Sequence, residues 1–160
     1  MLQIRFICVG KLKEKFYKDA AGEYLKRLSA YCKTELDELP ESRLGDRPSP
    51  AEIDAALKAE ADGILTRLPA GAAAVALCVE GEERDSAGMA ALLQKYAANG
   101  ISKICFVIGG SCGLHRTIKE RADVRLSMSR MTFPHHLARI MLLEQVYRAF
   151  KIAEGGKYHK

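Results

Sequence analysis

Two continuous runs of apolar residues constrain the fold of this chain more than any other feature. Residues 73–79 read AAVALCV and residues 103–108 read KICFVI, without the polar alternation of a strand that has one face in water. Strands of this kind are typical of a parallel sheet that helices cover on both faces. The two runs therefore predict an α/β fold with buried strands, and we expect strand 73–79 to be central.

Extended and helical patterns alternate along the rest of the chain. Apolar residues repeat at helical spacing from Leu12 through Phe16 to Leu28, and Ser49 and Glu52 have the spacing of a capping box that starts a second helix. Predicted strands cover residues 2–9, 34–39, 73–79, 103–108 and 124–129, and a helix is expected after each. This order predicts one domain over residues 1–160 with a mostly parallel, doubly wound sheet. The charged strand 34–39 is expected at an edge, and the polar, proline-rich stretch 40–49 as a mobile loop.

The charge of the chain is unevenly distributed. Residues 1–100 contain 14 Lys and Arg against 16 Asp and Glu, a formal charge of −2, whereas residues 101–160 contain 11 against 4, a charge of +7. An acidic partner such as RNA is therefore expected to meet the C-terminal part of the chain.

The five cysteines do not form the pattern of a disulfide framework or a zinc site. Their number is odd, no C-x-x-C pair occurs, and Cys8, Cys78 and Cys105 lie in apolar runs, so we expect buried thiols of a reducing cytosol and no metal. The chain begins directly with a strand pattern and has no run of 18 apolar residues. We therefore expect neither a signal peptide nor a membrane span, and a cytoplasmic location.

A glycine-rich loop follows the second apolar run. Gly109, Gly110 and Gly113 allow positive φ angles and a close approach of backbone N–H groups to a ligand. The loop lacks the spacing of a dinucleotide fingerprint or of a Walker loop. By itself it is equally consistent with a tight turn from strand to helix.

A second loop, residues 127–134, precedes the last predicted helix. Its Ser and Thr groups suit hydrogen bonds to a purine-like group between Met131 and Phe133, and the alternative is an apolar connection in which Thr132 caps the helix. His135 and His136 are adjacent, so their side chains are expected to diverge by about 100° on a helix. That arrangement argues against joint metal binding.

The last helix and the tail combine apolar and basic residues. The helix is apolar around much of its circumference, which indicates a central position or a subunit interface. Tyr158 and His159 in the tail suit stacking on a base. Basic residues that would suit phosphates are Arg139, Arg148, Lys151, Lys157 and Lys160.

Three stretches of this region carry a family resemblance. The runs IGGSCGL, LSMSRMTFPHHLARIMLLEQVYRAFKI and YHK, together with the opening IRFICVGKLKEKFYKDAAGEYLKRL, closely resemble the RlmH family of the SPOUT methyltransferase superfamily. The resemblance extends over the whole chain. It implies a homodimer with a C-terminal trefoil knot, the knot and cofactor site lying within about residues 73–160. It also implies S-adenosylmethionine as methyl donor, no metal, and methylation of N3 of a pseudouridine (position 1915 type) in 23S rRNA of the assembled ribosome.

The resemblance also implies the site residues. S-adenosylmethionine binding is expected at Leu77, Gly110, Ser129, Arg130, Met131, Thr132, Phe133 and Pro134. Substrate positioning and catalysis are expected at His135, Arg148, Tyr158 and His159, with His159 as the favoured proton acceptor and Arg148 stabilising the developing anion.

This chain departs from the family pattern at two places. Ser111-Cys112 stands where the family commonly has Pro-Glu, and Lys157 stands where a proline precedes the terminal Tyr-His. Two alternative functions remain open: a SPOUT enzyme that acts on tRNA or on a ribose hydroxyl, and a non-catalytic RNA-binding module.

Overall fold

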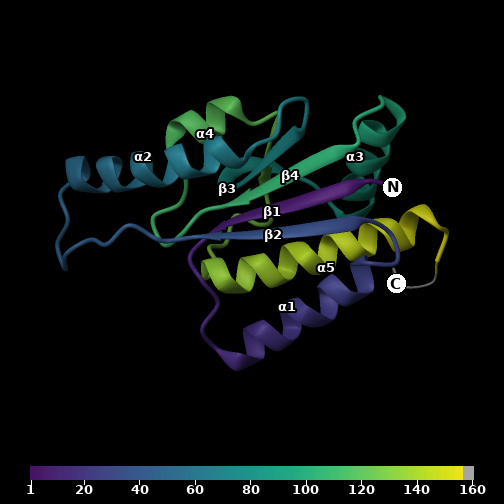
Figure 1. Ribbon diagram of the computed structural model, residues 1–160, viewed down its shortest axis with the longest axis horizontal. Coiled ribbons are helices and arrows are strands. Elements are labelled where there is room, and N and C mark those ends of the chain that lie inside the picture. The colour runs from purple at the N-terminus through teal and green to yellow at the C-terminus, as the bar shows by residue number, and fades with distance from the viewer. Residues whose placement is uncertain (157–160) are drawn as a thin grey trace.

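A computed structural model describes residues 1–156 and places them around one parallel sheet (Figure 1). Within this part of the chain the sheet has five strands in the order β2-β1-β4-β3-β5. The strands are β1 (Gln3–Val9), β2 (Lys33–Leu39), β3 (Ala73–Glu83), β4 (Lys103–Ile108) and β5 (Val124–Ser127). The helices are α1 (Lys15–Leu28), α2 (Pro50–Arg67), α3 (Ser86–Ala98), α4 (Arg116–Arg121) and α5 (His135–Ala153). The predicted α/β class, element order and parallel sheet are confirmed.

Burial along the strands follows their apolar patterns. β4 lies at the centre of the sheet, parallel to β1 on one side and to β3 on the other. Its residues Ile104 to Ile108 are all buried, as the continuous apolar run predicts. β3 is an interior strand, although β4 and not β3 occupies the middle position, and the charged strand β2 lies at an edge as predicted.

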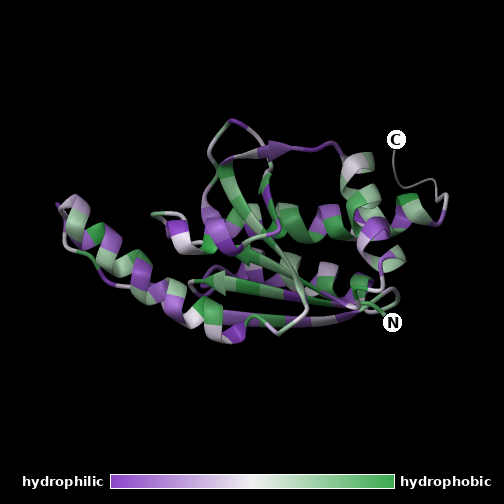
Figure 2. Ribbon diagram, turned by 90° about the horizontal axis from the view of Figure 1, so that it is seen from above, coloured by the Kyte–Doolittle hydropathy of each residue, from purple (hydrophilic) through white to green (hydrophobic). Residues whose placement is uncertain are grey.

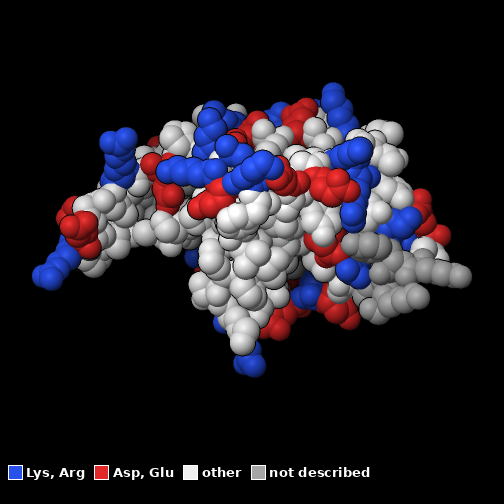
Figure 3. All heavy atoms as spheres, turned by 90° about the horizontal axis from the view of Figure 1, so that it is seen from below, with Lys and Arg blue, Asp and Glu red and all other residues white. Residues whose placement is uncertain are grey.

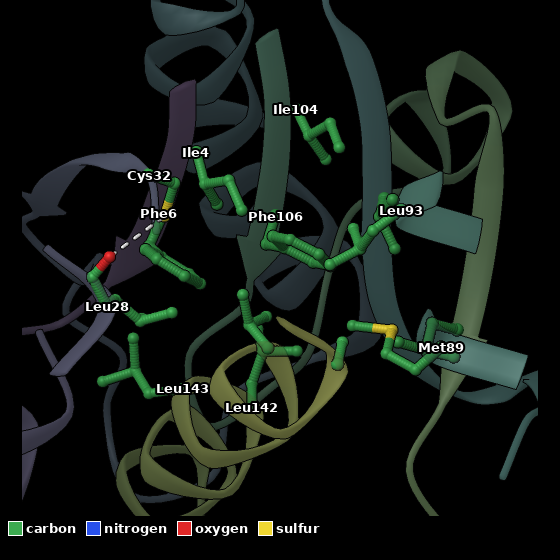
Figure 4. Close-up of a cluster of buried hydrophobic side chains, with 14 of the residues drawn as sticks. Ile4, Phe6, Leu28, Cys32, Met89, Leu93, Ile104, Phe106, Leu142 and Leu143 are labelled. Atoms are coloured by element: carbon green, nitrogen blue, oxygen red, sulfur yellow. Dashed lines mark hydrogen bonds between the residues drawn. The ribbon is translucent and has the colours of Figure 1, made fainter. Parts of the chain in front are cut away.

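The helices form one layer on each side of the sheet. α1, α3 and α5 pack together on one face, where their apolar residues meet Phe6 and Phe106 (Figure 4). These two rings stack with centroids 5.6 Å apart. α2 and α4 cover the other face through residues such as Ile64 and Ile118. Figure 2 shows the corresponding pattern, with hydrophobic residues along the strands and alternating hydropathy along α2.

The first helix differs from its sequence-based prediction at its start. α1 begins at Lys15, so Leu12 belongs to the preceding connection, where it is buried. Phe16 was expected on the apolar face, but it is 65% exposed. The second helix begins as predicted, with the Ser49 hydroxyl and the Glu52 side chain forming a reciprocal capping box.

No helix within residues 1–156 is both long enough and apolar enough to cross a membrane.

Candidate active site

A pocket of about 740 Å³ opens at the carboxyl ends of β3, β4 and β5. Three segments line it: Leu77 to Glu80 within β3, Gly109 to Leu114 after β4, and Met128 to His135 after β5. Arg130 of the third segment does not line the pocket. Its volume is that of a site for a drug-sized ligand. The carboxyl edge of a parallel sheet is also where open α/β folds bind ligands.

Most of the residues expected at the S-adenosylmethionine site line this pocket. They are Leu77, Gly110, Ser129, Met131, Thr132, Phe133 and Pro134, and His135 joins them from the first turn of α5. Arg130 is the exception: its side chain is 94% exposed and points to Glu83, with Nε 3.8 Å from the carboxylate. The structure therefore brings together three segments that are separated by up to about fifty residues in the sequence.

The glycine loop is a tight turn. Gly113 has φ +80°, and its N–H donates to the Gly110 carbonyl at 3.1 Å. A Cβ on Gly109 would overlap the Gly113 carbonyl oxygen, so only glycine fits at position 109. The turn leaves the loop backbone on the wall of the pocket. The expected tight turn is therefore confirmed, and the same residues line the pocket, while ligand binding by this loop stays a prediction.

Glu41 supports the glycine loop from the segment after β2. Its Oε1 accepts hydrogen bonds from the Ser111 N–H at 2.8 Å and from the Ser111 hydroxyl. A Cβ on Gly110 would lie 2.6 Å from that oxygen, so the glycine at position 110 makes room for the carboxylate. Burial opposes ionisation of Glu41, but the Ser111 hydrogen bonds and the two nearby histidines outweigh it and lower its pKa.

Sequence reasoning missed Glu41 because its contacts are non-local. Glu41 lies in the stretch 40–49 that we predicted to be a mobile loop, and Ser111 is 70 residues away. No local pattern joins two such positions. The glycine loop has no acidic residue of its own, yet Glu41 brings a carboxylate to it from elsewhere in the chain.

β3 contains an irregularity where it borders the pocket. Its pairing with β5 shifts between Leu77 and Glu82, and the intervening residues include Cys78 to Glu80 of the pocket wall. Gly81 permits this path, because a Cβ there would lie 2.6 Å from the Arg125 carbonyl oxygen. The predicted strand ended at Val79, but β3 continues to Glu83. A glycine within a strand pattern is the signal that could have indicated a bulge.

The loop before α5 is ordered by its own serines. The Ser127 hydroxyl donates to the Ser129 carbonyl at 3.0 Å, and the Met131 N–H donates to the Ser129 hydroxyl at 3.0 Å. The alternative in which Thr132 caps the helix is wrong, because the N-cap is Pro134 and has no side-chain capping bond. Met131 is 73% exposed and stands at the rim of the pocket.

His135 and His136 do not diverge as predicted. Their ring centroids are 4.2 Å apart in an edge-to-face contact, because both side chains turn toward Gly10 at the end of β1. Both Nε2 atoms are buried without a hydrogen-bond partner in residues 1–156. Burial, followed by the neighbouring His136, lowers the pKa of His135. The lowered pKa favours the neutral imidazole of His135 on the pocket wall.

Arg139 was expected to suit phosphates, but it is a core residue. Its side chain is 1% exposed, and Nη1 donates to Glu38 Oε2 at 2.6 Å while Nη2 donates to the Gly10 carbonyl at 2.8 Å. Glu38 also accepts the Leu12 N–H at 3.0 Å. Burial acts to raise the pKa of Glu38, but these hydrogen bonds and the adjacent positive charges lower it overall.

Arg148 lies apart from the pocket in a single chain. It is 13 residues after His135, which corresponds to about 20 Å along an α-helix. Its Nη2 donates to Glu144 Oε1 at 2.6 Å, and Arg148 does not line the pocket. Lys151, also expected to suit phosphates, contacts Tyr31 and Glu154. Lys157, Tyr158, His159 and Lys160 lie outside the described residues.

A second pocket, of about 490 Å³, lies between α1, α3 and α5. Its wall includes Tyr24, Met89, Ile140, Met141 and Glu144. Among residues 1–156, no group of three or more His, Cys, Asp and Glu side chains has the arrangement of a metal site.

Comparison with known proteins relates the whole chain to methyltransferases. The family profile described as "Predicted SPOUT methyltransferase" matches residues 2–159. The chain is 45% identical over 159 residues to the protein named "Ribosomal RNA large subunit methyltransferase H" of Bacillus pumilus (strain SAFR-032), which covers 99% of this chain and 100% of the relative. A protein of the same name from Bacillus thuringiensis (strain Al Hakam) has the same identity and coverage.

Two solved structures share the fold at low sequence identity. A probable methyltransferase from Bordetella pertussis Tohama I superposes with a TM-score of 0.57 at 17% identity, covering 92% of this chain and 94% of that one. A probable methylase family protein from Haemophilus influenzae Rd KW20 gives a TM-score of 0.57 at 15% identity, with 98% and 70% coverage.

Proposed function

Because the chain belongs to the SPOUT methyltransferase family, we propose that it transfers the methyl group of S-adenosylmethionine to N3 of a pseudouridine in 23S rRNA. The target we propose is the pseudouridine of the 1915 type in the assembled ribosome. The observation that carries the proposal is the pocket at the carboxyl ends of β3, β4 and β5, lined by all but one of the residues that the family resemblance assigns to the methyl donor. The name of the 45% identical relatives supports ribosomal RNA as the substrate.

The pocket suits the methyl donor by its shape and lining. Its walls combine the apolar side chains of Leu77, Met131 and Phe133 with the backbone of the glycine loop. Such a mixture fits a ligand with a flat purine ring and polar groups that orient it. S-adenosylmethionine supplies an activated methyl group on a positively charged sulfur, so the proposed reaction requires no metal.

The chemistry of the reaction defines what the protein must contribute. N3 of pseudouridine loses its proton, an N–C bond forms, and the C–S bond breaks to leave a neutral thioether. The protein must hold N3, the methyl carbon and the sulfur in line and accept the N3 proton. We assign the proton to His159, directly or through water, and place the neutral His135 on the wall beside the reacting atoms. Arg148 is assigned to the negative charge that develops on the ring carbonyl.

These assignments require a second copy of the chain. His135 and Arg148 lie on one helix, about 20 Å apart, so one chain does not present both to the same base. We therefore propose a homodimer packed through α5, in which Arg148 and the tail of one protomer approach the pocket of the other. The half-buried Ile140 and Met141, which line the second pocket, provide apolar surface for such an interface.

The remaining parts of the proposal concern the whole chain. We propose that residues 1–160 form one domain, that a trefoil knot lies within about residues 73–160, and that the enzyme acts in the cytoplasm. The proposal of a knot rests on the resemblance to the RlmH family. The proposal of a cytoplasmic location rests on the proposed ribosomal substrate.

Nucleoside mass spectrometry tests the reaction. Purified protein, S-adenosylmethionine and ribosomes from a strain that lacks the activity should yield one N3-methylated pseudouridine in 23S rRNA. Methylation of tRNA in the same assay would identify another SPOUT activity. Calorimetry that shows no binding of S-adenosylmethionine would instead identify an RNA-binding module without catalysis.

A further inference from the structure

The connection between β1 and α1, together with the first turn of α1, carries a concentration of lysines. Residues 11–18 (KLKEKFYK), here called the lysine segment, contain four lysines and one glutamate, a formal charge of +3. They lie in the part of the chain, residues 1–100, whose formal charge is −2. All four lysine side chains are exposed, and within residues 1–156 only Lys15 has an ion-pair partner, Asp19 at 2.6 Å.

An exposed aromatic ring accompanies these lysines. Phe16 is 65% exposed, whereas the other phenylalanines within residues 1–156 are buried or half-buried. Its ring contacts that of Tyr17 in a tilted arrangement, with centroids 4.4 Å apart and an interplanar angle of 50°. Figure 3 shows the surface on the α1 side of the molecule, where basic side chains gather in a band together with some acidic ones.

The backbone under the lysine segment is held by the buried Arg139 and by its partner Glu38. Arg139 binds the Gly10 carbonyl at 2.8 Å, and Glu38, paired with Arg139, accepts the Leu12 N–H at 3.0 Å. Leu12 itself is buried between two exposed lysines. Taking an arginine out of water is costly, and here its contacts fix the path of a surface connection. Lys11 and Lys13 therefore project from a fixed backbone.

The lysine segment adjoins the candidate active site through the first turn of α5. A Cβ on Gly10 would lie 3.3 Å from His135 Nε2, and His135 lines the pocket. The ring of His136 meets Tyr17 edge to face at 6.0 Å, and its Nδ1 lies 3.9 Å from Glu14 Oε2. The segment and the pocket are thus linked through the adjacent residues His136 and His135, of which only His135 lines the pocket.

We propose that the lysine segment is a docking surface for the phosphate backbone of the RNA substrate, with Phe16 stacking on an unpaired base next to the target. This inference rests on the proposed function, and it adds a recognition surface from the N-terminal part of the chain. Lysines bind phosphates as flexible point charges, and an exposed aromatic ring accepts a base without regard to its identity. A single-stranded loop of RNA offers both phosphates and unstacked bases.

Removal of charge from the lysine segment tests the proposal. We compare the wild type with a Lys11→Gln/Lys13→Gln/Lys18→Gln variant in methylation of ribosomes and in binding of a labelled 23S rRNA stem-loop across a salt series. We expect KM for ribosomes to rise on the order of tenfold, with kcat and S-adenosylmethionine binding unchanged. Neutralising one phosphate-bound lysine reduces the steepness of log affinity against log salt by about 0.7 to 0.9, so a reduction of about 2 to 3 is expected for the three lysines.

A matched control removes the same charge from elsewhere. Lys33, Lys95 and Lys103 are exposed, and Lys33 and Lys103 start β2 and β4 at the opposite end of the sheet. The Lys33→Gln/Lys95→Gln/Lys103→Gln variant should change KM by less than about twofold. Phe16→Ala should weaken stem-loop binding about tenfold with an unchanged salt slope, and Phe16→Tyr should restore it.

The outcomes separate this proposal from the proposed function. If the wild type methylates rRNA but the two triple variants behave alike, the docking surface is wrong and the function stands. If the wild type methylates no rRNA, the function is wrong, and stem-loop affinity still decides the surface. In that case a selective loss in the lysine-segment variant supports an RNA-binding surface, and equal affinities overturn it.

Discussion

Glu41 and Ser111, 70 residues apart in the sequence, are joined by two hydrogen bonds to a single carboxylate oxygen, from the Ser111 N–H at 2.8 Å and from its hydroxyl. The other oxygen of Glu41 lies 3.9 Å from His135 Nε2. One side chain from the segment after β2 thus contacts the glycine loop and faces the histidine on the pocket wall. The shape of the proposed cofactor site depends on this residue, which does not line the pocket itself.

Replacement of Glu41 by glutamine should weaken binding of S-adenosylmethionine about fivefold to tenfold. The loss of a charge-assisted hydrogen bond loosens the glycine loop and costs about 1 kcal/mol at this partly exposed position. Isothermal titration calorimetry measures the effect, with Glu23→Gln on the exposed face of α1 as the control. An affinity equal to that of the wild type would show that the loop holds its shape without Glu41.

Gly110→Ala should also weaken S-adenosylmethionine binding, through Glu41. The new Cβ would lie 2.6 Å from Glu41 Oε1 and 3.2 Å from Val9 Cγ1, so the carboxylate must leave Ser111. In a Glu41→Ala background the same substitution should cost several-fold less affinity, because the group it displaces is already absent. Additive effects in this double-mutant cycle would show that the new Cβ weakens binding through a clash with Val9 or within the pocket, and not through Glu41.

Glu38→Gln should lower the free energy of unfolding by about 3 kcal/mol at pH 7, because it leaves the buried guanidinium of Arg139 without its carboxylate. The pKa of Glu38 is lower in the folded state than the ordinary 4.5. The pair therefore stabilises the fold fully above that value, and its contribution is lost as the pH falls through the folded-state pKa. Urea denaturation at pH 7 and at acidic pH measures both effects. If acid lowers the free energy of unfolding as much in Glu38→Gln as in the wild type, the Glu38–Arg139 pair is not the source of the pH dependence.

Alkylation of the native protein should modify Cys112 first. Cys112 is exposed on the glycine loop, whereas burial raises the pKa of Cys8 to about 12 and that of Cys32 to about 11. Thiolate is the reactive form, so these buried thiols stay unmodified at pH 8. Saturating S-adenosylmethionine should slow the labelling of Cys112, as peptide mass spectrometry can follow. A labelling rate independent of S-adenosylmethionine would argue against binding beside this loop.

Deletion of residues 157–160 should leave the melting temperature and S-adenosylmethionine binding nearly unchanged, because the hydrophobic core lies within residues 4–149. Methylation of ribosomes should fall by orders of magnitude if Tyr158 and His159 act on the RNA. His159→Ala alone should cost less than the deletion but still about 100-fold if it accepts the N3 proton. Full activity of the shortened chain would show that His135 or water, and not His159, accepts the N3 proton.

Local patterns predicted the elements of this fold well. The apolar run of β4 and the capping box at Ser49 are properties of neighbouring residues, and each was found as predicted. The start of α1 was wrong because Leu12 is apolar at helical spacing, yet it is buried by the core contacts of a loop. A periodic pattern reports that a residue is buried and does not report which element buries it.

The family resemblance selected residues that lie together in the candidate site, but residues whose contacts are non-local were missed or misplaced. Leu77 and Thr132, which the resemblance assigns to the methyl donor, line the pocket. Glu41, the inward turn of the His135–His136 pair and the burial of Arg139 each depend on segments that meet only in the folded chain. The distribution of charge predicted that an acidic partner contacts only the C-terminal part of the chain. The lysine segment, in the N-terminal part, follows the carboxyl end of β1 and so lies at the same edge of the sheet as the pocket.

The position of β4 between β1 and β3 determines when these two strands become parts of one sheet during synthesis. Phe6 of β1 and Val75 of β3 both pair with Phe106, so no sheet joins them until residues 103–108 have emerged. At about 5 to 20 residues per second, β1 waits about 5 to 20 s for its inner neighbour. During that interval the nascent chain exposes two separate apolar strands. The same strand order that buries the core so completely makes the growing chain a candidate for chaperone binding until its last third has been made.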